Sequence, residues 1–321
     1  MDIRQLRYFI AIVEARSFSR AAEQLRVAQP ALSQHVLAME AELGVTLLHR
    51  GARGVVPTEE GLRLLDRAHA IDAQLSALHD HVSGREAHPS GEVRFGMPGT
   101  VSEQLGVPLI EAARRHYPEV RIRIAEAMSG FVLGWLRDGV VDIAMLYNMA
   151  DERGLAMHPA LTEEIRLFGT PDMTGAPRGD TVSLATSLRL PLIVPSPSHG
   201  LRNLIDVAAL SIGKRADPAI EIDSYRQIKR LAARRLAFGM LPTVAIGQEI
   251  RDGTFRSWRI TRPAVMRRIF LGYRTDRPLS AASRAVGQLS WALLRDMVRS
   301  EVWSALWTEN DDLQLYSISR G

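Results

Sequence analysis

The sequence predicts an α/β protein in which a small helical head and one long helix precede a larger region of alternating strands and helices. Three observations lead to this prediction. Apolar residues recur at helical spacing through the first 45 residues, and a heptad repeat of apolar residues follows. Beyond residue 91, short strand-like segments alternate with helical ones.

The composition is that of a globular protein with ordinary hydrophobic cores. The chain has 321 residues, of which 46% are hydrophobic and 24% charged, with 40 Lys and Arg against 36 Asp and Glu. It contains no cysteine, which excludes disulfides, thiolate metal sites and cysteine nucleophiles. No apolar stretch is long enough for a signal-peptide core or a membrane helix, so we expect a protein of the cytoplasm without membrane contact.

Three short helices are predicted before residue 45. Apolar residues from Leu6 to Val13 follow the i, i+3, i+4, i+7 rule of a helix with one buried face. A second helix is expected from Ser19, with a serine cap, and a third begins at Gln29-Pro30 and stops at Gly44. Three short helices in this space predict a helix-turn-helix.

The outward face of the third helix has the composition that base reading in a DNA major groove requires. Its side chains are small or carry amides, and none is acidic. The outward residues are Gln29, Ala31, Ser33, Gln34 and His35. An ordinary polar helix face is the alternative interpretation.

A basic hairpin, or wing, is predicted next. Arg50 and Arg53 lie in the turn between two apolar runs, where they could contact DNA phosphates or a narrow minor groove. Solvated turn arginines are the alternative. Charge alone would favour the other end of the chain, since residues 251–300 carry eleven arginines against three acidic residues, whereas residues 1–53 carry seven against five.

A long helix is predicted from residue 58 to about residue 85. Its apolar residues alternate at spacings of four and three, which is the heptad pattern that pairs two helices. These residues are Leu64, Ala68, Ile71, Leu75, Leu78 and Val82. The pattern predicts a dimer that places two heads on two half-sites, and a helix packed only against its own domain is the alternative.

Beyond a linker at residues 84–91, the alternation predicts a mostly parallel sheet covered on both faces. Strands are expected at 92–95, 120–127, 141–147, 190–194, 236–240 and 269–273, and helices at 101–116, 130–138, 225–235, 243–251 and 280–298. Two segments that follow strands, 96–102 and 195–202, carry glycines, hydroxyls, His199 and Arg202. They could hold a small carboxylate between two lobes, with ordinary loop chemistry as the alternative.

Enzyme signatures are missing from the sequence. It contains no GxGxxG, GxxxxGKS/T, HExxH or GxSxG, so no enzyme is predicted and no metal site or cofactor is expected. Two alternatives to a DNA-binding protein remain: a small-molecule sensor whose head contacts only other proteins, and an enzyme that uses the α/β cleft.

Several stretches together resemble the LysR-type transcriptional regulators over nearly the whole chain. Residues 18–34 are similar to the family's helix-turn-helix, and residues 43–61 to its wing and the start of its linker helix. Landmarks of the family's effector domain are matched at 117–120, 139–144, 241–242 and 277–280. Residues 198–202 and 221–224 look most like the subgroup that includes the nitrogen assimilation control regulators.

The resemblance implies a winged helix-turn-helix at residues 1–58, a coiled-coil linker helix at 59–88, an effector domain at 89–300 and an extension at 301–321. The effector domain would resemble type 2 periplasmic binding proteins and consist of subdomain I (91–162 and 268–300) and subdomain II (163–267). The family typically forms homotetramers on promoter DNA that respond to a small-molecule effector, and RNA polymerase is a candidate further partner. By position, DNA contacts would come from Gln29, Pro30, Ser33, Gln34, Arg50 and Arg53, and the effector cleft would be lined by Thr100, Ser102, Ser129, Ser198, His199 and Arg202.

The chain departs from the family pattern at three places. Gln34 stands where arginine is common, which would shift the preferred base from guanine toward adenine. Arg235 stands in a turn that is glycine-rich in many relatives, a departure that bears on the cleft wall and on effector sensing. Residues 301–321 extend past the usual end and could pack on a neighbouring subunit or be loose.

Overall fold

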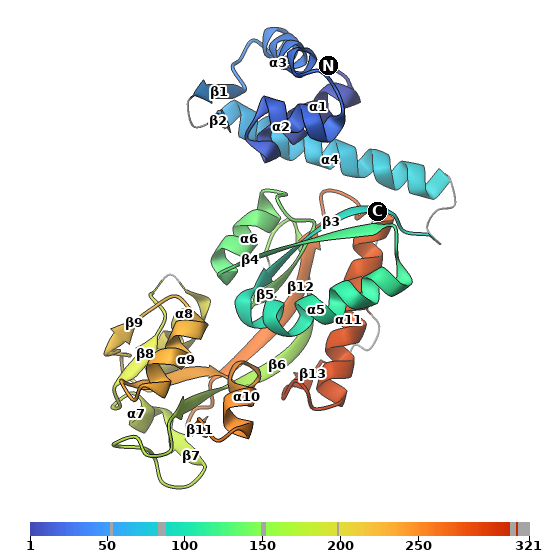
Figure 1. The fold of residues 1–321 in the computed structure, drawn as a ribbon. Coiled ribbons are helices and arrows are strands. Elements are labelled where there is room, and N and C mark those ends of the chain that lie inside the picture. Colours follow the sequence, from blue (N-terminus) through green and yellow to red (C-terminus); the bar gives the residue numbers. More distant parts are fainter. Residues whose placement is uncertain (52–53, 83–87, 149–151, 198, 309–312, 314–321) are drawn as a thin grey trace.

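In the computed structural model, a helical head, a long linker helix and two α/β lobes follow one another along the molecule (Figure 1). The structure describes residues 1–51, 54–82, 88–148, 152–197, 199–308 and 313. Within these ranges, no helix is both long and apolar enough to cross a membrane.

The head is a three-helix unit closed by a two-stranded wing. Its elements are α1 (Ile3–Ala15), α2 (Phe18–Leu25), α3 (Gln29–Leu43), β1 (Leu48–Gly51) and β2 (Gly54–Pro57). The apolar faces of the helices form one core in which Phe9, Leu32 and Val36 are fully buried. Gly54 has φ of 102°, and a Cβ there would lie 2.6 Å from the carbonyl oxygen of Arg16. Glycine therefore lets the wing pack against the turn between α1 and α2.

The linker helix α4 (Glu59–Val82) begins at Thr58, whose hydroxyl accepts a bond from the Gly61 amide over 2.9 Å. Ala68 lies in the core of the head and has no exposed surface. The prediction that it contacts a partner helix is therefore wrong, because it packs against its own chain. Leu64 is half-buried against the same core. The side chain of Val82 lies outside the described part of the chain. The exposed seam consists of Ile71, Leu75 and Leu78.

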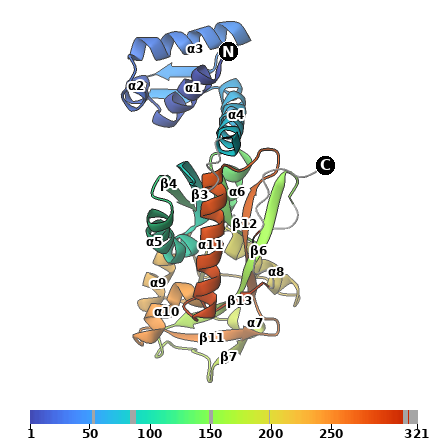
Figure 2. The ribbon, with the colours of Figure 1, turned by 90° about the vertical axis from the view of Figure 1, so that its right-hand side faces the viewer.

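Lobe I is a sheet covered on both faces. Its elements are β3 (Gly91–Pro98), α5 (Gly99–His116), β4 (Val120–Ala127), α6 (Ser129–Arg137), β5 (Ile143–Tyr147), β12 (Met266–Arg274) and α11 (Ala281–Arg299). Alternation along β5 explains the two faces: Ile143 and Met145 pack with α5 and α11, whereas Ala144 and Leu146 pack with α6. Figure 2 shows α11 along the side of this sheet.

Lobe II is a second α/β unit around Phe168, Phe238 and Trp258, all fully buried. Its elements are β7 (Thr181–Ser183), α7 (Leu184–Ser187), β8 (Leu192–Val194), α8 (Gly200–Leu210), β9 (Ile220–Glu221), α9 (Tyr225–Ala233), β10 (Phe238–Pro242), α10 (Thr243–Arg251) and β11 (Arg256–Thr261).

One long strand, β6 (Leu155–Gly169), runs through both lobes and joins them. It pairs antiparallel with β12 in lobe I and with β10 and β11 in lobe II. The prediction of a mostly parallel sheet is therefore wrong for the centre of the molecule. It holds for the neighbours β4-β3-β5 and β10-β8-β9, which helices connect in sequence.

The described start of the C-terminal extension packs on its own chain. Strand β13 (Leu306–Trp307) pairs antiparallel with β6, and Trp303 is fully buried. The rest of the extension lies outside the described residues, Leu313 excepted.

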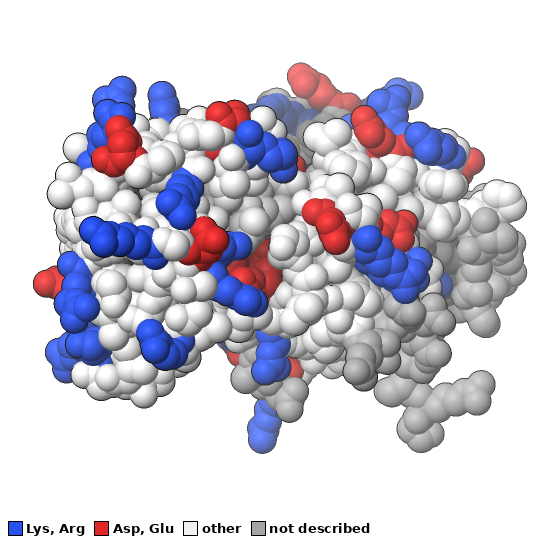
Figure 3. All heavy atoms as spheres, turned by 90° about the horizontal axis from the view of Figure 1, so that it is seen from below, with Lys and Arg blue, Asp and Glu red and all other residues white. Residues whose placement is uncertain are grey.

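Ion pairs account for much of the arginine surplus in residues 251–300. Arg256 pairs with Asp180, and Arg259 pairs with Glu164. The face of the lobes opposite the head shows scattered basic side chains with acidic ones among them (Figure 3). The surplus therefore does not mark a nucleic-acid surface on that face.

Candidate functional site

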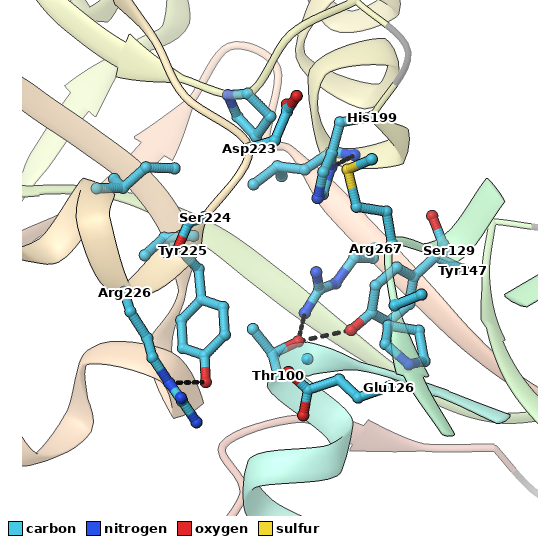
Figure 4. Close-up of a pocket in the computed structure, with 18 residues that line it drawn as sticks. Thr100, Glu126, Ser129, Tyr147, His199, Asp223, Ser224, Tyr225, Arg226 and Arg267 are labelled. Atoms are coloured by element: carbon cyan, nitrogen blue, oxygen red, sulfur yellow. Dashed lines mark hydrogen bonds between the residues drawn. The ribbon is translucent and has the colours of Figure 1, made fainter. Parts of the chain in front are cut away.

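A cavity of about 310 Å³ lies between the two lobes (Figure 4). The N-termini of four helices border it: α5 and α6 from lobe I, and α8 and α9 from lobe II. The lobes approach closely here, because a Cβ added to Gly200 would lie 2.7 Å from the Ser129 hydroxyl. We call this cavity the interlobe cleft.

The two helices of lobe I begin at the cleft without a side-chain cap. Their N-cap residues are Pro98 and Met128, and neither accepts a bond from a first-turn amide. By contrast, His199 caps α8 and Ser224 caps α9. Uncapped amides at a helix N-terminus favour an anion, so the lobe I wall offers two anion-binding ends.

Arg267 on β12 brings a buried positive charge to the same wall. Its Nε donates to Glu163 Oε1 over 2.8 Å, and its Nη2 donates to Glu163 Oε1 and to Thr100 Oγ1. The guanidinium lies 4.0 Å from the ring centroid of Tyr147. Nη1 has no hydrogen-bond partner among the described residues, and Arg267 lines the cleft. This nitrogen can therefore donate to a ligand.

The lobe II wall carries a neutral histidine and a tyrosine. His199 Nδ1 accepts the Leu201 amide over 3.1 Å, and burial lowers the pKa of His199, which keeps the ring uncharged at neutral pH. Burial and the nearby Glu103 carboxylate raise the pKa of Tyr225 to about 12. A Cβ added to Gly99 at the start of α5 would lie 2.9 Å from the Tyr225 ring, so Tyr225 of lobe II packs against lobe I across the cleft.

The structure places three of the predicted effector residues, Thr100, Ser129 and His199, on the cleft wall. Two predictions are wrong. Ser102 lies further along α5, where its hydroxyl is 3.9 Å from the Cβ position of Gly106, and it does not line the cavity. Arg202 is held by ion pairs with two carboxylates and is also absent from the lining. Ser198 lies outside the described residues.

Arg235 does not enter the cleft. It adopts φ of 59°, the left-handed conformation that glycine takes more easily, and its guanidinium pairs with Asp172 at the surface. The departure from the family pattern therefore leaves the described cleft wall intact.

The second candidate site is the exposed face of α3. Gln29, Pro30 and Gln34 are exposed, as predicted for groove reading. Ser33 is half-buried, and its hydroxyl accepts a bond from Arg50 Nη1 over 2.8 Å. Sequence reasoning missed Leu37, which is 55% exposed and lies one turn after Ser33. Its i+4 spacing from Ser33 was the available signal.

The wing supports this face. Arg50 reaches from β1 to α3 and lies 4.5 Å from the ring centroid of Phe18, so the hairpin, α2 and α3 are held together by one side chain. Arg53 lies outside the described residues. Within the described ranges, no group of three His, Asp or Glu residues could hold a metal ion.

Comparison with known proteins finds family models over the two regions that contain these sites. The model of the LysR substrate binding domain matches residues 86–295, and that of the bacterial regulatory helix-turn-helix protein, lysR family, matches residues 3–62. The nitrogen assimilation regulatory protein nac of Escherichia coli is 31% identical over 302 residues, which cover 93% of this chain and 97% of that protein.

Solved structures agree on the fold. A full-length OxyR variant from Pseudomonas aeruginosa aligns with a TM-score of 0.79 at 20% identity, covering 97% of this chain and 98% of that one. Full-length CbnR in complex with its target DNA aligns with a TM-score of 0.53 at 23% identity, covering 91% and 100%. The relatives are named as regulators rather than enzymes. The chain belongs to the LysR family of bacterial helix-turn-helix transcriptional regulators.

Proposed function

We propose that the chain regulates promoters in the cytoplasm by sequence-specific binding, and that a small carboxylate in the interlobe cleft modulates this binding. The observation that supports a carboxylate effector is the position of Arg267 beside the uncapped N-termini of α5 and α6. Its Nη1 has no hydrogen-bond partner in the part of the chain that the structure describes. No other cofactor enters the proposal. Without cysteine, the chain has no thiol for redox sensing.

Self-association is part of the proposal. Ile71, Leu75 and Leu78 leave an apolar stripe exposed on α4. Exposed apolar residues also lie on α5 and α8, which face opposite sides of the lobes (Figure 2). They are Val107 and Ile110 on α5, and Val207 and Leu210 on α8. Two kinds of self-contact, through α4 and through the lobes, would support a tetramer.

The proposed signal path runs along β12. Arg267 lies near one end of this strand at the cleft, and Arg274 ends it at the linker helix. There Arg274 Nη1 donates to Asp66 Oδ1 of α4 over 2.5 Å and to the carbonyl oxygen of Arg137. Closing the lobes around an anion would therefore shift the contact between Arg274 and the linker helix. A shifted linker helix would change the distance between the two heads of a dimer and the bend of the bound DNA. At a promoter, RNA polymerase is the partner that such a change would reach.

Thermal denaturation with a panel of small carboxylates tests the effector class. A bound effector raises the melting temperature by mass action, and Ser129→Ala should weaken that rise because Ser129 lines the cleft and caps nothing. If no carboxylate shifts the wild-type melting temperature, the effector proposal is wrong.

A salt-titrated gel-shift assay tests DNA binding independently. Phosphate contacts release counterions, so affinity must fall steeply as salt rises. A head that contacts only proteins would shift no DNA at any salt concentration.

A further inference from the structure

The C-terminal extension reaches the cleft wall from behind. Trp303 is fully buried, and its indole Nε1 donates to Glu163 Oε2 over 2.8 Å. Strand β13 pairs with β6 at Thr162 and Leu161, directly beside Glu163. The Thr308 amide continues this pairing by donating to the carbonyl oxygen of Ala160 over 3.1 Å.

Glu163 connects this segment to the effector side chain. On the paired strands, Glu163 stands directly opposite Arg267. Its Oε1 accepts both bonds from Arg267, so Trp303 supplies the donor for Oε2. Glu163 is 1% and Arg267 2% exposed, so water cannot replace a missing partner without a rearrangement.

We propose that Trp303 is a positioning residue of the effector site: it fixes the Glu163 carboxylate in the orientation that directs Arg267 into the interlobe cleft. The extension thereby helps to set the affinity for the anionic effector. The identity of the ligand rests on the proposed function, whereas the geometry of the Glu163–Arg267 pair does not.

The physical reason is the cost of an unpaired buried carboxylate oxygen. Without the indole N–H, Oε2 of Glu163 has no donor among the described residues. Leaving a buried carboxylate oxygen without a hydrogen bond is energetically costly. The carboxylate can relieve this by rotating, and Arg267 must follow because both of its bonded nitrogens use Oε1. The bond from Nη2 to Thr100 and the stacking on Tyr147 then loosen.

The chain offers a matched control for the indole N–H. Trp307 lies in the same segment and packs edge-on against Trp291 at 5.1 Å between ring centroids. Its Nε1 is buried and has no hydrogen-bond partner among the residues that the structure describes. Trp303→Phe and Trp307→Phe both exchange an indole for a phenyl ring, and only the first removes a hydrogen bond.

Two measurements on the full chain test the inference. The first follows acetate binding, as probe anion, by NMR titration. We expect Trp303→Phe to bind acetate about tenfold more weakly than wild type, the effect of one hydrogen bond to a charged group. The acetate affinity of Trp307→Phe should stay within about twofold of wild type.

The second measurement follows the NMR signal of the Arg267 Nε–H in arginine-labelled protein, assigned by its loss in Arg267→Lys. Its exchange with solvent should be faster in Trp303→Phe and unchanged in Trp307→Phe.

If Trp303→Phe keeps both the acetate affinity and the Arg267 exchange rate of wild type, the inference is overturned. If wild type binds no acetate while the Arg267 signal changes only in Trp303→Phe, the positioning role stands and the carboxylate effector fails. A second variant, Glu163→Gln, keeps the assay decisive if Trp303→Phe does not fold. Glu163→Gln should bind acetate as weakly as expected for Trp303→Phe. If its acetate affinity falls no more than that of Trp307→Phe, the Glu163–Arg267 pair does not position the effector site.

Discussion

Arg267 carries a permanent charge at the wall of the cleft. Burial acts against that charge, but Glu163 and Tyr147 more than compensate, so the pKa of Arg267 is raised above its ordinary value. The guanidinium stays protonated wherever the protein is folded. A carboxylate therefore meets a preformed cation, and its binding needs no proton transfer at this side chain.

Gln34 allows a test of base reading by a single side chain. It is exposed on the α3 face, and an amide can form a bidentate contact with adenine. Gln34→Ala should weaken binding to the specific site by about 1–3 kcal/mol and leave random-sequence DNA almost unchanged. Competition gel shifts measure both affinities, with Gln227→Ala on lobe II as an exposed control. Equal losses on both DNAs would mean that Gln34 reads no base.

The sequence predicted residues of the cleft that follow directly from strand–helix junctions. Thr100 and His199 are of this kind, because they lie in segments that directly follow predicted strands. Ser129 was predicted only from the resemblance to the family. Arg267 was not predicted, since its role depends on Glu163, which lies 104 positions away in the chain. Arg202 was wrongly predicted because helix α8, which places Asp206 one turn after it, was not foreseen, and because the pair with Glu221 on β9 is not local in the sequence.

At the scale of elements, the exposed stripe on α4 predicts a dimer contact. Leu75→Glu places a charge in the stripe of Ile71, Leu75 and Leu78, where burial against a partner helix would be strongly unfavourable. Sedimentation should show a lower mass than for wild type. The control is Leu62→Glu, an exposed leucine of the same helix outside the stripe, which should keep the wild-type mass. If Leu75→Glu also keeps it, the stripe is not an interface.

The contact between α4 and lobe I should weaken in acid. Burial, with the nearby guanidinium groups of Arg94 and Arg277, lowers the pKa of His69 to about 3. In the unfolded chain His69 takes up a proton near pH 6.5, whereas in the folded protein it stays neutral down to about pH 3. Protonation therefore favours the unfolded state, and stability that is present above pH 6.5 is lost as the pH falls toward 3. The loss reaches about 2 kcal/mol at pH 5.

Urea unfolding at pH 7 and pH 5 measures this effect in wild type and in His69→Gln, which does not titrate there. The half-buried histidines His158 and His199, whose pKa values are also lowered, are common to both proteins, so their contributions cancel in the comparison. The difference between pH 7 and pH 5 should be about 2 kcal/mol larger in wild type. The same pH dependence in both would show that His69 can be protonated in the folded protein.

Helices α2, α3 and α4 begin within one residue of their predicted starts. By contrast, Arg50 lies in strand β1 and not in the predicted turn of the wing, and β6 was missed. The helices are determined locally by the spacing of their apolar residues. β6 mixes apolar residues with Glu163, Glu164 and Arg166. Its two glutamates pair with arginines on β12 and β11. Such cross-strand pairing is absent from any local window, so periodicity could not reveal the strand.

For the whole molecule, the bond between Arg274 and Asp66 should couple effector and DNA. Asp66→Asn removes the charge that α4 presents to Arg274 but leaves the cleft untouched. We expect carboxylate binding by calorimetry to be unchanged, while the effect of the carboxylate on DNA affinity shrinks severalfold. A full response in Asp66→Asn would rule out this contact as the coupling element.

In the proposed complex, two copies of the α3 face lie in grooves of one DNA duplex and are held at a set distance by paired α4 helices. A nuclease footprint of the full chain on its promoter tests this arrangement. We expect two protected half-sites on one side of the duplex, with centres about 10 base pairs apart or a multiple of that spacing. A single protected half-site, or protection without this helical phase, would contradict it.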